Sequence, residues 1–276
     1  MADSGVPDYF FRLCFYGEQQ MQVYVCVKHV PDSAAHIAIL DQHRIDENIS
    51  FLLNPYDEHA VTEAVKIKKK YPDSEVIAVC LGKADAERTL RSALAMGADR
   101  GILIVRDKNC DIRITALALK TTIEQDGKPG LIFTGKESID EGGMQTMFRI
   151  GALFDFPVST NVVKLDIEAD KAVVVCELSG GITDTYEMSL PCVVGAGKGL
   201  NIPRYPTFPD VVKSKKKPVV KIDFRDLNID DSLTGMRVVE LKPLHQARQP
   251  RQIKGDAAAV AKELIRILKQ EAKVLS

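Results

Sequence analysis

The chain has 276 residues, of which 45% are hydrophobic and 27% are charged, enough apolar material for a globular fold. Its 37 basic and 38 acidic residues nearly cancel, which excludes a general attraction to nucleic acid or an anionic membrane and leaves only local charge, as in the basic cluster near residue 213. The six cysteines form no C-x-x-C pair, the histidines lack metal-ligand spacing, and no stretch approaches the ~18 apolar residues of a membrane span. We therefore expect reduced thiols in a cytoplasmic protein without a metal site.

Residues 1–20 contain an apolar patch but lack the basic leading region and the small-residue cleavage site of a secretion signal. The first clear strand begins directly after Met21. We expect residues 1–20 to be an extension outside the fold.

Residues 21–196 carry the pattern of an α/β domain. The runs 22–27, 75–80, 101–105 and 130–134 are continuously apolar, as in parallel strands that are buried on both faces. Four segments show helical spacing of apolar residues. The first follows Asn54-Pro55, the second covers about 84–96 and ends at Gly97, the third covers about 111–125 and ends at Gly127, and the fourth follows Gly142-Gly143. Alternating segments at 161–167, 171–177 and 183–190 predict an antiparallel extension of the same sheet.

Residues 197–255 show little periodicity and contain six prolines, so we expect an extended arm that lies on another protein. Residues 256–276 then predict a terminal helix. Asp256 is its expected N-cap, and its apolar residues recur at helical spacing at Val260, Leu264, Ile265 and Leu268.

Residues 133–146 leave a buried strand, turn through glycine and polar residues, and enter a helix. In α/β sheets this is where backbone N–H groups and the helix dipole bind phosphates, and Lys136, Ser138, Gln145 and Thr146 add side-chain donors. Taken alone, the segment fits a surface turn before a capped helix equally well. Asn54 has two interpretations as well: it can cap its helix, or it can bind a base or ribose.

Several motifs together resemble the β-subunits of electron-transfer flavoproteins. Residues 54–64 read N-P-Y-D-E-H-A-V-T-E-A, residues 90–101 read L-R-S-A-L-A-M-G-A-D-R-G, residues 135–140 read G-K-E-S-I-D, and residues 203–205 read P-R-Y. The resemblance covers nearly all of residues 21–276. It implies a Rossmann-like α/β fold of the adenine nucleotide α-hydrolase-like type, with a mostly parallel sheet, an antiparallel extension and a C-terminal arm whose helix docks on the α-subunit.

The resemblance also implies an electron-carrier subunit without catalytic residues of its own. In that family the β-subunit holds a structural AMP, and FAD is held mainly by the α-subunit. Electrons come from acyl-CoA-type dehydrogenases and pass to an acceptor oxidoreductase. Carried over to this chain, the predicted nucleotide contacts are Cys26 and Leu81, mainly through backbone, together with Asn54, Pro55, Tyr56, Asp57, Gly135, Lys136, Glu137, Ser138, Ile139, Asp140, Glu141, Gly142, Gly143, Met144, Gln145 and Thr146. Tyr56 matches an aromatic residue that approaches the flavin edge.

A bifurcating branch of the family carries a second FAD in place of AMP and reacts with NADH. Gln145-Thr146 matches the AMP-binding carriers, and Met147-Phe148 replaces the Gly-Pro of bifurcating relatives, whereas Gly142-Gly143 departs from both patterns. We expect AMP, and the second FAD stays the alternative. A nucleotide-hydrolysing or adenylating enzyme is the rival from another class, but the chain has no P-loop and no Ser/Cys–His arrangement to support it.

Residues 201–217 resemble the loop with which the family docks on acyl-CoA dehydrogenases. Phe208, between Pro206 and Pro209, stands at the anchor position, and the following lysines, Lys213, Lys215, Lys216 and Lys217, would steer the encounter with an acidic patch. Without the resemblance, the same segment fits a solvated charge run after a buried phenylalanine. Glu177 matches a carboxylate that pairs with an α-subunit arginine.

Overall fold

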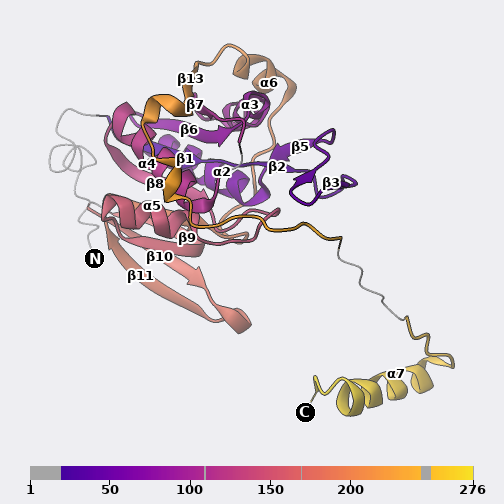
Figure 1. The fold of residues 1–276 in the computed structure, drawn as a ribbon. Helices are drawn as coiled ribbons and strands as arrows, with labels where there is room; N and C mark the ends of the chain where they lie inside the picture. Colours follow the sequence, from indigo (N-terminus) through magenta and orange to yellow (C-terminus); the bar gives the residue numbers. More distant parts are fainter. Residues whose placement is uncertain (1–19, 109, 169, 244–249, 276) are drawn as a thin grey trace, which may run out of the picture.

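A computed structural model describes residues 20–108, 110–168, 170–243 and 250–275. Within them a nine-stranded sheet has the order β11-β10-β9-β12-β8-β1-β6-β7-β13 (Figure 1). The extension predicted over residues 1–20 lies outside the described residues except for Gln20, which is exposed. The predicted α/β fold with a large, mostly parallel sheet is confirmed.

The centre of the sheet is made of the four predicted parallel strands. These are β1 (Gln22–Cys26), β6 (Glu75–Gly82), β7 (Arg100–Val105) and β8 (Pro129–Gly135). Along β1, Val23 and Val25 pack into one hydrophobic cluster and Tyr24 and Cys26 into another, on opposite faces of the sheet. A strand covered on both faces must be apolar at every position, which explains the uninterrupted apolar runs.

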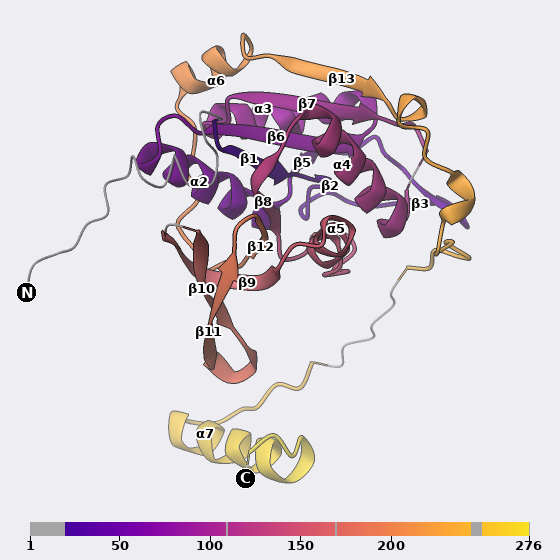
Figure 2. The same cartoon turned by 90° about the vertical axis from the view of Figure 1, so that its left-hand side faces the viewer.

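Helices cover both faces of this sheet. The helices α2 (Pro55–Lys70) and α3 (Glu87–Met96) contribute to the first cluster, whereas α4 (Ile112–Asp126) and α5 (Thr146–Phe154) contribute to the second (Figure 2). A 3-10 turn, η2 (Ala84–Ala86), precedes α3. Gly97 ends α3 with a φ of 134°, a conformation that favours glycine, and Gly127 follows α4. The four predicted helices are thus confirmed.

The antiparallel extension is also confirmed, as β9 (Val158–Glu168), β10 (Lys171–Glu177) and β11 (Thr183–Ser189), with the turn η3 (Ser179–Gly181). The strand that connects this extension to the core was not predicted. The strand β12 (Cys192–Ala196) lies between β9 and β8 and pairs in parallel with both, so it joins the extension to the parallel core. Two small unpredicted sheets pair β2 (His29–Pro31) with β5 (Phe51–Leu53) and β3 (Ile39–Asp41) with β4 (Arg44–Ile45).

The expectation that residues 197–255 lie on another protein is wrong for part of this segment. Helix α6 (Phe208–Ser214) is followed by β13 (Val219–Asp223), which pairs in parallel with β7 at the edge of the sheet. Two 3-10 turns, η4 (Phe224–Leu227) and η5 (Asp231–Leu233), come next, and the first buries Phe224 and Leu227 in the second hydrophobic cluster. The segment therefore completes its own domain up to about residue 233.

The terminal helix is present as α7 (Ala257–Arg266), continued by the π-helical turn η6 (Ile267–Glu271). Asp256 caps it, as predicted, by accepting a hydrogen bond from the backbone N–H of Ala259 at 2.8 Å. Figures 1 and 2 show α7 apart from the sheet, with Leu264 and Ile265 about half exposed. Its predicted docking on the α-subunit stays a prediction.

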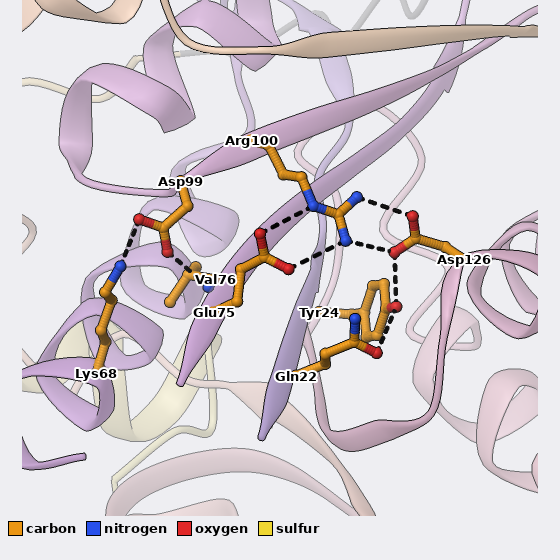
Figure 3. A network of polar contacts seen from close by, with 8 residues as sticks. All are labelled: Gln22, Tyr24, Lys68, Glu75, Val76, Asp99, Arg100 and Asp126. Carbon is orange, nitrogen blue, oxygen red and sulfur yellow. Dashed lines mark hydrogen bonds and ion pairs between the residues drawn. The ribbon is translucent and has the colours of Figure 1, made fainter. Parts of the chain in front are cut away.

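A polar network closes the amino-terminal edge of the parallel strands (Figure 3). Arg100, at the start of β7, forms two hydrogen bonds to Glu75 (3.0 and 3.1 Å) and two to Asp126 (2.8 and 2.7 Å). The Tyr24 hydroxyl donates to Asp126 at 2.7 Å, and the Asp99 carboxylate accepts from the Val76 N–H while pairing with Lys68. These contacts join the beginnings of three strands to the end of α4. Ligands of α/β sheets usually bind at the opposite, carboxyl-terminal ends of the strands.

Candidate functional site

A buried carboxylate organises the carboxyl-terminal edge of the parallel strands. Asp57, in the first turn of α2, accepts hydrogen bonds from the backbone N–H of Lys28 after β1 (2.7 Å), from that of Gly135 at the end of β8 (2.9 Å), and from the Asn54 amide (2.9 Å). Burial raises the pKa of Asp57 to about 7, although all three donors favour the charged form. Asp57 therefore holds two strand ends and a helix start in one place.

Asn54 connects this centre to the loop between β8 and α5. Its amide donates to the Glu137 carbonyl oxygen at 2.8 Å, and its side-chain oxygen accepts from the Ile139 N–H at 3.2 Å. Asn54 occupies the N-cap position of α2 and Pro55 follows at the first helical position, as predicted, but the Asn54 side chain makes no capping bond. The Asn54 amide donates one hydrogen to Asp57 and the other to Glu137. Asn54 therefore holds the loop between β8 and α5 in place.

Gly135 is a position where only glycine fits. A Cβ atom there would lie 2.4 Å from the Asp57 carboxylate and 2.6 Å from the Tyr56 Cβ. The close approach of β8 to the start of α2 thus brings Tyr56 to the loop, where the Lys136 ammonium lies 5.2 Å from the centre of its ring. The predicted contacts at residues 54–57 and 135–139 are therefore brought together.

The turn that follows has irregular backbone geometry. Gly142 and Met144 both have positive φ, 59° and 50°, and the Gly142 N–H donates to the Ser138 carbonyl oxygen at 2.8 Å. Helix α5 begins at Thr146 without a side-chain cap, because Gln145 instead accepts hydrogen bonds from Arg149. Since the first turn of α5 also has no acidic residue, its N–H groups and positive helix end fit a phosphate.

The remaining predicted nucleotide contacts lie at the same edge. Cys26 is the last residue of β1 and Leu81 lies near the end of β6. Burial raises the pKa of the Cys26 thiol, so this cysteine is neutral and fits the predicted backbone role. Pro55 is exposed at the first position of α2, and a side chain at Gly143 would meet nothing within 4 Å, so the loop is open on its outer side.

Lys28 was not among the predicted site residues, yet its ammonium lies on this loop. It pairs with Asp140 at 2.9 Å and with Glu141 at 3.2 Å, and it donates to the Ser138 hydroxyl at 3.3 Å. Its position directly after a buried parallel strand is the signal that could have identified it, because such positions face the ligand side of α/β sheets.

The predicted docking residues form a separate group on α6. Phe208 is the first residue of this helix and 81% exposed, so it is available to a partner, but it lies on a helix and not on the predicted loop. Thr207 and Asp210 cap the helix reciprocally. Pro206 is half-buried, and Pro209, Lys213 and Lys216 are exposed.

Lys217 does not belong to this exposed group. Its ammonium turns back and donates to the carbonyl oxygens of Leu94 (2.9 Å) and Ala98 (2.5 Å) at the end of α3. The basic surface after Phe208 is therefore made by Lys213, Lys215 and Lys216.

Glu177 is an exposed residue at the end of β10, and Figures 1 and 2 show β10 and α6 on opposite sides of the molecule. Its predicted pairing with an α-subunit arginine stays a prediction. Across the described ranges, no three His, Cys, Asp or Glu side chains are grouped as a metal ion would require. The same ranges contain no helix with the length and apolarity needed to cross a membrane.

Comparison with known proteins identifies the family. Residues 43–227 match the family model described as "Electron transfer flavoprotein domain". The electron transfer flavoprotein subunit beta of Bacillus subtilis is 33% identical over 261 residues, which cover 92% of this chain and 100% of that protein. The mitochondrial subunit beta of Arabidopsis thaliana is 35% identical over 259 residues, covering 92% and 100%, and that of Mus musculus is 34% identical over 255 residues, covering 90% and 99%. The chain therefore belongs to the electron transfer flavoprotein family, as a β-subunit of a flavoprotein that transports electrons.

Proposed function

We propose that this chain holds a structural AMP and pairs with an α-subunit that holds most of the FAD. The heterodimer accepts electrons from acyl-CoA-type dehydrogenases and passes them to an acceptor oxidoreductase. FAD supplies the redox chemistry when bound, and this chain contributes no catalytic residue of its own. The five described cysteines are free, which supports a reducing compartment such as the cytoplasm.

The backbone of residues 142–146 is the observation that carries the AMP assignment. Two positive-φ residues and a helix start without a side-chain cap lie together at the carboxyl-terminal ends of the parallel strands, where backbone N–H groups can bind an anion. Lys136, Ser138 and Thr146 stand beside them as half-buried side-chain donors. Asn54 and Asp57 fix the other end of the same loop, so its donors are held in place before a ligand arrives.

The charges around the turn favour one phosphate over two. Asp140 and Glu141 precede the turn and are exposed or nearly so, and each additional phosphate would add charge of the same sign close to them. The N–H groups at the start of α5 are enough to bind a single phosphate, whereas the diphosphate of a second FAD would place additional negative charge near Asp140 and Glu141. We therefore assign the chain to the carriers and not to the bifurcating branch.

The α6 surface is proposed as the site that docks the dehydrogenase. An exposed phenylalanine on a capped helix can serve as an anchor, because its backbone is already ordered and less conformational entropy is lost on binding. The adjacent lysines would attract an acidic patch on the partner. Glu177 is proposed to contact the α-subunit from the far side of the sheet, where it would steady the mobile flavin domain.

The cofactor content of the purified heterodimer tests this proposal. Co-expression with the α-subunit, followed by denaturation and chromatographic quantification, is expected to give one FAD and one AMP per heterodimer. Two FAD per heterodimer, or reduction of the flavin by NADH without a dehydrogenase, would show that the bifurcating alternative is correct.

A further inference from the structure

We propose that Lys28 is the residue that makes the 136–146 loop able to accept a nucleotide phosphate, because its single positive charge offsets part of the negative charge of Asp140 and Glu141. This inference rests on the proposed nucleotide function of the loop. Lys28 lies outside this loop, two residues after β1 ends, and its role would be to balance the charge of the loop and to position it.

The loop carries more negative than positive charge. Lys136 is its one basic residue and lies 3.6 Å from Glu137, so it already faces a carboxylate. Asp140 and Glu141 are left, and among the described residues Lys28 is the cation that pairs with them. Without Lys28, two uncompensated carboxylates would stand directly before the turn that must hold an anion.

The main chain of Lys28 is fixed independently of its side chain. Its N–H donates to Asp57 at 2.7 Å, and its carbonyl oxygen accepts from the Asn54 N–H at 3.1 Å. A substitution at Lys28 keeps both bonds, so the strand end and the start of α2 stay in place. The Lys28 side chain is 37% exposed, so added salt should weaken its ion pairs in part.

The geometry also explains why the acidic residues are tolerated at a phosphate site. The Lys28 ammonium lies at 2.9 Å from both Asp140 carboxylate oxygens and bonds Ser138 in addition. It thus draws the acidic part of the loop toward β1 while the turn at residues 142–146 is left to the ligand.

The experiment measures AMP binding to nucleotide-depleted heterodimers by equilibrium dialysis. Lys28→Met is expected to raise the dissociation constant of AMP about tenfold, which corresponds to a loss of about 1.4 kcal/mol of binding free energy. The triple variant Lys28→Met, Asp140→Asn, Glu141→Gln removes the same ion pairs and also the negative charge, so it is expected to recover most of the affinity. Lys171→Met is the matched control, since Lys171 also pairs with two carboxylates, those of Glu187 and Glu168, at a similar exposure, and lies on β10, which carries no predicted nucleotide contact. It should bind AMP like the unmodified protein.

Unchanged AMP binding in Lys28→Met would overturn the proposal. Weaker AMP binding that the triple variant does not recover would also overturn it, because Lys28 would then act by holding the loop in position and not by balancing charge. The unmodified heterodimer separates this from the proposed function. If it contains a second FAD and no AMP, the AMP assignment is wrong, and the same three variants measured with FAD as the probe decide the role of Lys28.

Discussion

Neighbouring lysines in one basic run have different roles. Lys217 donates to two carbonyl oxygens at the end of α3, where the helix dipole favours a cation, whereas Lys216 is exposed. Burial lowers the pKa of Lys217, and the nearby Asp99 carboxylate opposes this shift by favouring the charged form. Arg91 makes the reciprocal contact by donating from α3 to the carbonyl oxygens of Ser214 and Lys217.

We predict that Lys217→Met lowers the free energy of unfolding by about 1–2 kcal/mol, because it removes charge-assisted hydrogen bonds and leaves helix-end carbonyls unsatisfied. Lys216→Met should change stability by less than about 0.5 kcal/mol, as expected of an exposed side chain. Lys216→Met should instead slow association with the dehydrogenase at low salt. Denaturant unfolding and stopped-flow reduction of the heterodimer measure the two effects, and equal destabilisation by both variants would contradict the assignment.

At the scale of the element, α6 presents the predicted anchor in a fixed orientation. We predict that Phe208→Ala weakens the complex with the dehydrogenase at least about tenfold, the usual cost of losing a buried aromatic anchor, and leaves FAD content and the flavin spectrum unchanged. The measurement compares reduction by the dehydrogenase with reduction by a chemical reductant.

Val220→Ala is the control for this variant, because Val220 is also exposed but lies on β13, away from the anchor position. It should leave both rates unchanged. If Phe208→Ala lowers both rates equally, or lowers neither, α6 is not the docking element.

The elements that the sequence predicts well are those with a repeated physical signal. Four parallel strands are apolar throughout because both of their faces are covered, and each was found within two residues at either end. Helix α6 is not predicted because prolines at positions 206 and 209 usually interrupt helices. Pro209 lies in the first turn of α6, where a backbone N–H has no acceptor within the helix, so proline is tolerated there. The strand β13 is short and lies at an edge, so two of its five side chains are exposed and its apolar run is broken by Lys221.

The site was predicted where its residues are close in sequence and missed where they are not. The loop at 135–146 has a local motif, whereas the ion pair between Lys28 and Asp140 joins residues 112 positions apart and leaves no local spacing to recognise. Asn54 was expected to cap its helix from local preference, but its partners come from a loop more than eighty positions away. Local propensity was overridden by tertiary contacts in this case.

At the scale of the whole molecule, the C-terminal helix lies apart from the sheet, and its apolar face is not covered by the described part of the chain. We predict that the β-chain expressed alone self-associates or precipitates, because Val260, Leu264, Ile265 and Leu268 require cover from the α-subunit. Replacing these four residues with Gln should reduce self-association of the isolated chain and also weaken its binding to the α-subunit. Light scattering and co-purification measure the two results.

Lys262→Gln, on the polar side of α7, is the matched control and should change neither property. A monomeric, cooperatively melting unmodified β-chain would show that the terminal helix does not need the α-subunit.

The strand order has a consequence for how the domain forms during synthesis. The central strands β1, β6, β7 and β8 are neighbours and are all complete by residue 135, so a chain leaving the ribosome from its N-terminus can pair them first. The extension cannot follow in chain order, because β9 joins the core through β12, which is made after β10 and β11. One side of the sheet is therefore attached when residue 196 has been translated, and the other side remains an open edge until β13 ends at residue 223.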